Sequence, residues 1–198
     1  MKALLMKDLH IFWRRMKIVL VMLAVFAVIP SVFQTTFAIT YAAMVPYTIF
    51  SVDEASKWDQ LAAMMPYSTF ELVVSKYVLG FLAIGLSLSL VAVSRPVVAF
   101  LGGEPTAWGL VLAAVCISVL AMDLTLPFVF RFGVEKARMT MLLLIGAVCG
   151  GAGVLTVLVE EGVHFGFSGG LLALPAAAVI ATAVSIPLAM RCYEKREK

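Results

Sequence analysis

Long apolar segments alternate with short charged segments along the chain. The charge-poor segments cover residues 18–52, 72–94, 107–130, 140–159 and 169–190. Because about 20 apolar residues in a helix cross the hydrocarbon core of a bilayer, each of the last four segments predicts one membrane-spanning helix. We therefore expect an all-α, polytopic membrane protein.

The first apolar segment is too long for one straight span. At about 1.5 Å per residue, a helix over residues 18–52 would be about 52 Å long, against a hydrocarbon core of about 30 Å. The segment is therefore either one kinked span or a tight hairpin that turns near residues 34–36. The hairpin has helices over about 18–33 and 37–52, and Pro46 is expected to kink the second of them.

The distribution of Lys and Arg residues decides between these topologies. With the hairpin, the chain has six spans, and 14 of its 15 basic residues fall on the side of the two termini, with only Arg95 outside. A single first span splits the basic residues six against nine. Because cytoplasmic loops carry the excess of Lys and Arg, we predict six spans in the plasma membrane, with both termini in the cytoplasm. Residues 1–198 then form a single transmembrane domain.

Residues 1–17 precede the first span and predict an amphipathic helix on the inner leaflet. One face of this helix carries apolar residues at helical spacing: Leu5, Leu9, Phe12 and Met16. Basic residues lie beside that face, as in helices that bind a membrane surface. The alternative is that these basic residues only flank the first span, which leaves the topology unchanged.

The polar segment 53–71 is the longest cytoplasmic loop of this topology. Within it, Trp58, Leu61 and Met65 follow the spacing i, i+3, i+7 of one helix face. A short amphipathic helix is therefore expected in the loop, and it should end near Pro66.

Composition argues against a soluble enzyme. Hydrophobic residues make up 63% of the chain and charged residues 14%, against about 45–50% and 25% in soluble proteins. The net charge of +3 is spread over the edges of the apolar segments, so nucleic acid is not an expected partner. The three cysteines have no metal-binding spacing, and the two histidines are predicted on opposite sides of the membrane. We expect neither a metal site nor catalytic residues.

The sequence also lacks a phosphate-binding loop. An ATPase needs the pattern GxxxxGK[ST], whose backbone and side chains hold the phosphates and Mg²⁺, and no segment of this chain has that pattern. Any ATP-driven activity therefore needs a separate subunit, and no cofactor is expected in this chain.

Asp123 is the one acidic residue inside a predicted span. Carboxylates within a membrane are costly and are candidates for functional sites. Two interpretations stay open. Asp123 either accepts a hydrogen bond from a Ser or Thr of a neighbouring helix near the inner interface, or takes part in a substrate path or a subunit contact.

Small residues form a packing face in the fifth predicted span. Gly146 and Gly150 make a GxxxG pattern, and Ala147 with Gly151 repeats the spacing one residue later. Such faces let helix backbones approach closely. They predict close packing either within the chain or between two chains.

Blocks of the sequence resemble the permeases of the ABC type-2 family. The first comprises DEASKWD, MPYS and SKY, at residues 53–59, 65–68 and 75–77, and the second reads LPFVFRFGVEKAR, at residues 126–138. The chain is similar to the small six-span permeases that include the phenol-soluble-modulin exporter type. Thr69 is a departure, because members of the family often have Arg directly after the Pro-x-Ser turn.

The resemblance implies two paired permease chains, identical or paralogous, each docked to an ATPase subunit that holds ATP and Mg²⁺. The loop 53–71 would be the coupling helix. Its implied ATPase-coupling residues are Asp53, Glu54, Trp58, Asp59, Leu61, Met65 and Pro66. In the second cytoplasmic loop, 131–138, the implied contacts are Arg131, Glu135 and Lys136.

Three functions remain in competition. The first is an exporter permease that moves an amphipathic or hydrophobic substrate, such as a peptide, a lipid or a drug-like molecule, out of the cell. The second is a non-transporting membrane anchor or regulatory subunit of an ATPase. The third is an ATP-independent secondary transporter, which would need Asp123 to couple to ions and which no inverted repeat supports.

Overall fold

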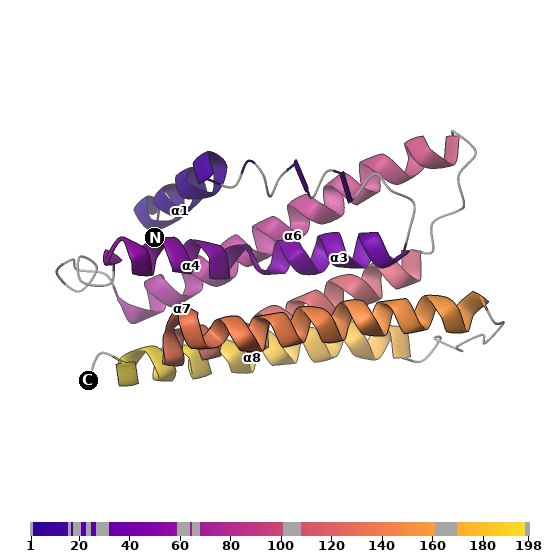
Figure 1. Cartoon of the computed structure of the whole chain (residues 1–198). Coiled ribbons are helices and arrows are strands. Elements are labelled where there is room, and N and C mark those ends of the chain that lie inside the picture. Colours follow the sequence, from indigo (N-terminus) through magenta and orange to yellow (C-terminus); the bar gives the residue numbers. More distant parts are fainter. Residues whose placement is uncertain are drawn as a thin grey trace.

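The chain folds into long helices that run along a common axis, with a short helix beside one end (Figure 1). The computed structural model describes residues 2–15, 17, 21–22, 25–26, 32–58, 64, 68–100, 108–160 and 170–196. The helices are α1 (Lys2–Arg15), α3 (Val32–Ala43), α4 (Val45–Ala55), α6 (Thr69–Phe100), α7 (Trp108–Glu160) and α8 (Gly170–Arg196). The predicted all-α class is confirmed for this part of the chain.

Four segments of the described helices are long and apolar enough to cross a membrane. They are Thr35–Ala55, Thr69–Pro96, Trp108–Val148 and Leu174–Tyr193. The predicted first span, 18–33, lies mostly outside the described residues, so the count of six spans stays a prediction. The start of α1 and the end of α8 lie at the same end of the bundle (Figure 1).

The second predicted span, 37–52, corresponds to α3 and α4. The predicted hairpin turn near residues 34–36 is wrong, because these residues lie within α3, which begins at Val32. The helix is interrupted at Met44, two residues before Pro46. Proline has no N–H group and its ring crowds the preceding turn, so a break at this position is expected. The amide of Thr48 still donates to the carbonyl of Met44, at 3.3 Å, and the chain continues in nearly the same direction (Figure 1).

The helices on either side of the predicted loop 53–71 have defined ends. Helix α4 ends where Lys57 takes a left-handed conformation, with φ 53°, and its amide donates to the carbonyl of Glu54 at 3.1 Å. Helix α6 begins with a Ser-x-x-Glu sequence, in which the amide of Glu71 donates to the hydroxyl of Ser68 at 3.2 Å. The loop between them therefore leaves from one fixed helix end and enters another.

Helix α7 corrects the predicted loop at 131–138. This segment is helical apart from Gly133, whose φ of 77° and ψ of 174° lie in a region that only glycine adopts readily. In Figure 1 the chain runs along one arm of α7, turns at the end of the bundle and returns along the second arm. The charged sequence was interpreted as a loop, but a single glycine suffices for the turn. Two helical arms that join at Gly133 thus correspond to the predicted spans 107–130 and 140–159.

Small residues allow α3 to pack at the centre of the bundle. Ala38 and Ala42 are fully buried, and the hydroxyls of Thr40 and Ser118 hydrogen-bond between α3 and α7 at 3.1 Å. Gly80 on α6 makes room for another helix, because an added Cβ would overlap Sδ of Met122 in α7. Close backbone approach at such residues replaces the hydrophobic driving force that is absent in lipid.

Candidate functional site

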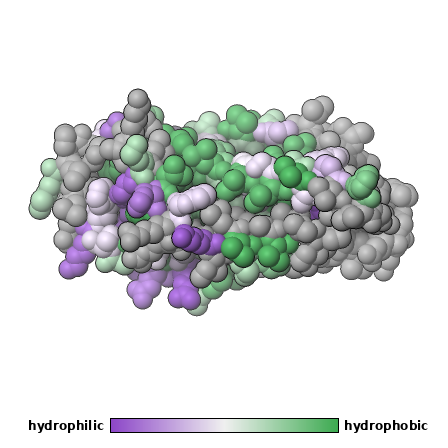
Figure 2. All heavy atoms as spheres, turned by 90° about the horizontal axis from the view of Figure 1, so that it is seen from above, coloured by the Kyte–Doolittle hydropathy of each residue, from purple (hydrophilic) through white to green (hydrophobic). Residues whose placement is uncertain are grey.

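Charged residues gather at the end of the bundle that contains both termini. Figure 2 shows hydrophilic residues toward that end and hydrophobic residues over the middle of the visible face. The start of α1, the end of α4, the start of α6 and the bend of α7 meet there. The two residues of the predicted acidic pair, Asp53 and Glu54, lie at the end of α4.

Four charged side chains from three helices form a closed ring of ion pairs, which we call the charge ring: Lys7, Asp8, Asp53 and Lys76. Asp53 pairs with Lys7 at 2.8 Å and with Lys76 at 2.6 Å. Asp8 pairs with Lys76 at 3.0 Å and with Lys7 at 3.2 Å. The ring has two positive and two negative members, so it ties α1, α4 and α6 together without a net charge.

The charge ring is largely shielded from solvent. The exposed fractions of the side chains are 0% for Asp8, 5% for Asp53, 8% for Lys76 and 22% for Lys7. A buried charge is tolerated when it is paired and hydrogen-bonded, and removing its partner is costly. Asp53, which was predicted to contact an ATPase groove, has its carboxylate inside the chain between two lysines.

Trp58 extends the charge ring toward the coupling loop. The Nζ atom of Lys7 lies 3.9 Å from the centroid of the Trp58 ring, which is within the range of a cation–π contact. Trp58 directly follows Lys57, which has a positive φ in the turn after α4. The first aromatic residue of the loop is therefore attached to α1. The other loop residues of the prediction lie outside the described residues: Asp59, Leu61, Met65 and Pro66.

Glu54 connects α4 to the bend of α7. Its carboxylate accepts a hydrogen bond from the amide of Val134 at 3.0 Å, and the hydroxyl of Tyr47 donates to the carbonyl of Val134 at 3.1 Å. Val134 follows Gly133 and begins the second arm of α7. A carboxylate at a helix N-terminus satisfies an amide that has no partner in its own helix.

A groove opens beside this contact. It has a volume of about 670 Å³ and lies between α4 and the second arm of α7. The lining residues are Tyr47, Ser51, Glu54, Ala55, Val134, Glu135 and Arg138. The side chains of Arg131, Glu135 and Lys136, the predicted second contact, are exposed next to the bend. They are available to a partner, whereas Asp53 is not.

The sequence did not predict Lys7, Asp8 and Lys76 as site residues. Lys7 and Lys76 had counted only as charges that set the topology. One feature of the sequence could have indicated the charge ring. Asp8 is an acidic residue in a basic segment, and it lies at helical spacing from Leu4 and Phe12. Both of these apolar residues are buried with Asp8 on the same face of α1.

Asp123 lies in a buried hydroxyl network between α6, α7 and α8. The hydroxyl of Thr182 donates to Oδ2 of Asp123 at 2.7 Å, and the hydroxyl of Ser185 donates to the Asp123 carbonyl at 2.5 Å. The hydroxyls of Ser185 and Tyr77 are 2.6 Å apart. The bond from Thr182 is of the kind that the first interpretation of Asp123 describes, a hydrogen bond from a Ser or Thr of a neighbouring helix. Within the described residues, no group of three or more His, Cys, Asp or Glu side chains is placed to hold a metal ion.

The small-residue face of α7 has no neighbour within the described part of the chain. Gly146, Ala147, Gly150 and Gly151 are all exposed. An added Cβ on any of the three glycines would meet nothing within 4 Å. Packing within the chain, one of the two interpretations of this face, is therefore not what the described residues show.

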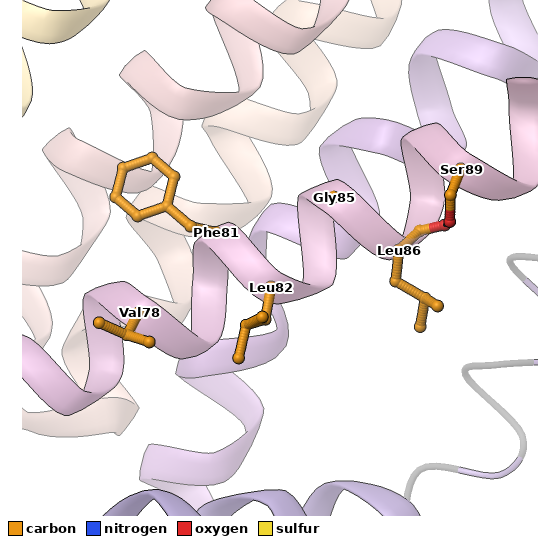
Figure 3. A pocket seen from close by; sticks show the side chains of 6 residues that line it. All are labelled: Val78, Phe81, Leu82, Gly85, Leu86 and Ser89. Atoms are coloured by element: carbon orange, nitrogen blue, oxygen red, sulfur yellow. The ribbon is translucent and has the colours of Figure 1, made fainter. Parts of the chain in front are cut away.

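A shallow apolar groove of about 500 Å³ lies on the outer side of α6. Figure 3 shows its lining residues along one side of the helix: Val78, Phe81, Leu82, Gly85, Leu86 and Ser89. The hydroxyl of Ser89 donates to the carbonyl of Leu86 at 2.7 Å, so it is satisfied within its own helix. The surface is suited to lipid tails or to another apolar surface.

Comparison with known proteins identifies the family. The model of the family described as "ABC-2 family transporter protein" matches residues 3–194. No curated protein and no solved structure matches the chain. The family match covers nearly the whole chain, including both arms of α7 and every member of the charge ring. The chain belongs to the ABC-2 transporter family, and it is a multi-pass membrane component of such a transporter that is not itself catalytic.

Proposed function

We propose that the chain is the permease of an exporter that a separate ATPase subunit drives. It would pair with a second permease chain, identical or paralogous, and move an amphipathic or hydrophobic substrate out of the cell. The ATPase subunit would supply the ATP and Mg²⁺ site that this sequence lacks. The family membership implies the ATPase partner.

The proposal rests on one observation: the two neighbouring acidic residues, Asp53 and Glu54, bind different helices. Asp53 binds α1 and α6 through Lys7 and Lys76, whereas its neighbour Glu54 binds the bend of α7 through Val134. Both residues end α4, directly before the loop that is the proposed ATPase contact. A displacement of that loop would therefore reach four helices through contacts of about one hydrogen-bond length each.

The acidic pair thus has a different role from the one predicted from the sequence. Asp53 is shielded by its two lysine partners, so we assign it to transmission within the permease. Direct contact with the ATPase is assigned to the loop that follows and to the exposed residues beside the groove: Arg131, Glu135 and Lys136. Charged, exposed side chains suit a docking surface that must also separate.

The proposed substrate class rests on the apolar character of the spans. The described spans carry exposed Leu, Ile, Val and Phe residues, and the α6 groove has an apolar lining. Asp123, the acidic residue of the predicted span 107–130, accepts a hydrogen bond from Thr182 and is not exposed. These surfaces favour a substrate with apolar groups over a sugar or an ion.

The proposed second chain has a candidate contact in the small-residue face of α7. Gly146 and Gly150 are exposed and have open space above them, so the backbone of another helix can come close. We propose this face as the seam between two permease chains.

A mild-detergent pull-down of the tagged chain from its native membrane tests the proposed function. We expect an ATPase with a phosphate-binding loop to be recovered in near-equal amount and identified by mass spectrometry. A charge-reversal variant at the exposed contact, Arg131→Glu with Lys136→Glu, should recover less ATPase. The matched control is Lys17→Glu, which changes another exposed lysine away from the groove.

Recovery of the chain alone, without ATPase activity, would contradict the proposal and favour a secondary transporter. Recovery of an ATPase whose turnover does not respond to any amphipathic peptide, lipid or drug-like compound would favour the anchor or regulatory subunit.

A further inference from the structure

Asp123 has a buried carboxyl group without a positive partner. It lies in the first arm of α7, within a segment that is apolar enough to cross a membrane, and it is 5% exposed. Among the described residues, Asp123 forms no ion pair. A buried carboxylate needs a compensating cation, as in the charge ring, and a carboxyl group that lacks one takes up a proton instead. The surroundings of Asp123 therefore favour the neutral carboxylic acid.

The hydrogen bonds of the carboxyl group also favour the neutral acid. Oδ2 of Asp123 contacts Thr182, whereas Oδ1 is buried and has no hydrogen-bond partner within the part of the chain that the structure describes. An ionised carboxylate can accept about four hydrogen bonds, and it would lose most of them here. A neutral acid carries less negative charge on Oδ1, so an unpartnered Oδ1 costs less free energy in that form.

The hydroxyl of Thr182 lies between two oxygen acceptors. It is 2.7 Å from Oδ2 of Asp123 and 2.9 Å from the carbonyl of Ala178 in its own helix. A hydroxyl has one proton, but its oxygen can also accept a hydrogen bond. The donation from Thr182 to Oδ2 is the arrangement of an ionised Asp123, and it leaves no proton for Ala178. If Asp123 is protonated, Oδ2 donates to Thr182 and Thr182 donates to Ala178, so that both distances are hydrogen bonds.

The neighbouring titratable side chains do not replace the missing cation. Ser185 donates its single proton to the main-chain carbonyl of Asp123, so the hydroxyl of Tyr77 on α6 donates to Ser185 and not to the carboxyl group. Cys192 on α8 interacts electrostatically with Tyr77. Neither side chain can carry a positive charge, and Lys76, next to Tyr77 in the sequence, is held in the charge ring.

We propose that Asp123 is a proton-binding site, at which the protonated carboxyl group donates to Thr182 and holds α7 against α8. The two helices lie side by side (Figure 1). Loss of the proton would reverse the bond between Asp123 and Thr182 and leave an uncompensated charge between the helices. The contact of α7 with α8 is therefore stronger at neutral pH than at alkaline pH. The proton is a ligand of the fold, so this inference goes beyond the proposed exporter and does not depend on it.

Infrared spectroscopy of the full chain in an ester-free detergent tests the proposal. A protonated carboxyl group has a C=O band that a carboxylate lacks, and ¹³C-labelled aspartate assigns such a band to aspartate because the label shifts it. The chain has four aspartates: Asp8, Asp53, Asp59 and Asp123. At pH 7 all but about one in a thousand ordinary aspartates are ionised. We expect one protonated band that shifts with the label at this pH, and its absence would overturn the proposal.

Two substitutions assign the band to Asp123 and to its bond with Thr182. Asp123→Asn should remove the band, whereas Asp59→Asn, the matched control at another aspartate, should leave it unchanged. Thr182→Val should keep the band but move it to higher frequency, because the acid loses its acceptor. A band that survives in Asp123→Asn would overturn the site, and a band that Thr182→Val does not move would overturn the donation to Thr182.

Thermal unfolding at two pH values tests the link between α7 and α8. A change from neutral to alkaline pH should lower the unfolding temperature more in the native chain than in Asp123→Asn, because asparagine has no carboxyl proton to lose. An equal decrease in the two chains would overturn the proton-dependent link. Because none of these measurements requires an ATPase, their failure is distinguishable from failure of the pull-down.

Discussion

Replacement of Lys76 by methionine is expected to lower the free energy of unfolding by about 3–5 kcal/mol, because it leaves two buried carboxylates, Asp8 and Asp53, to share the single cation of Lys7. Lys76 is 8% exposed and pairs with both Asp8 and Asp53. Methionine retains most of the length and volume of the lysine side chain, so the loss reports the charge. The measurement is the unfolding of the purified chain in mild detergent, with Lys136→Met as the exposed control.

A second substitution separates the effect of the lost positive charge from the effect of lost side-chain packing. Lys76→Met combined with Asp53→Asn removes one charge of each sign and leaves Lys7 paired with Asp8 at 3.2 Å. We expect the double variant to be more stable than Lys76→Met alone. If the two losses simply add, the ring does not act as a unit, and its assignment as a cooperative link fails.

Gly133→Ala is expected to destabilise the chain by about 1–3 kcal/mol, because a side chain is strained at this backbone conformation. The φ of 77° and ψ of 174° at Gly133 produce the turn between the two arms of α7. Any relief of the strain would also move Val134, which is held by Glu54 and Tyr47. The loss of stability should therefore be accompanied by a weaker response of the permease to its ATPase.

Gly146→Ala is the matched control for this substitution. Gly146 lies in the second arm of α7, is exposed and has open space where a Cβ would be. There, alanine should be neutral or stabilising in the isolated chain, because glycine is about 1 kcal/mol less favourable in a helix interior. Equal effects of the two substitutions would show that the bend does not require glycine.

Hydropathy located the long helices because each membrane-spanning helix needs about 20 apolar residues of its own, whatever the rest of the chain does. The predicted span 72–94 lies within α6, and the predicted span 169–190 corresponds to α8. The orientation that the charge distribution predicts stays a prediction. Arg95, the one basic residue predicted outside, is buried and donates a hydrogen bond to Thr35 at the start of α3.

The ion partners of Asp53 could not be predicted, because they depend on tertiary structure. Lys76 is 23 residues away along the chain and Lys7 is 46 residues away. In the sequence alone, an acidic pair at a helix end is equally compatible with a docking surface. Only the packing of α1 and α6 on α4 shows that Asp53 is enclosed.

The bend of α7 was obscured by its charges. Residues 131–138 are polar enough for a loop, and hydropathy contains no information on whether such a segment stays helical. All of these residues are helical except Gly133, whose φ and ψ values turn the chain from one arm into the other. The segment 126–138, which resembles the family, contains this glycine, but the resemblance does not indicate the backbone conformation of Gly133.

The most direct test of the account is hydrogen exchange at the bend of α7 in the complex with the proposed ATPase. The amide of Val134 donates to Glu54, so its protection reports the contact between the coupling segment and α7. We expect ATP and Mg²⁺ to change the exchange of the peptide across Gly133 in the native chain. In Glu54→Ala this change should be lost while the ATPase stays bound. An equal ATP-dependent change in the native chain and in Glu54→Ala would contradict transmission through the acidic pair.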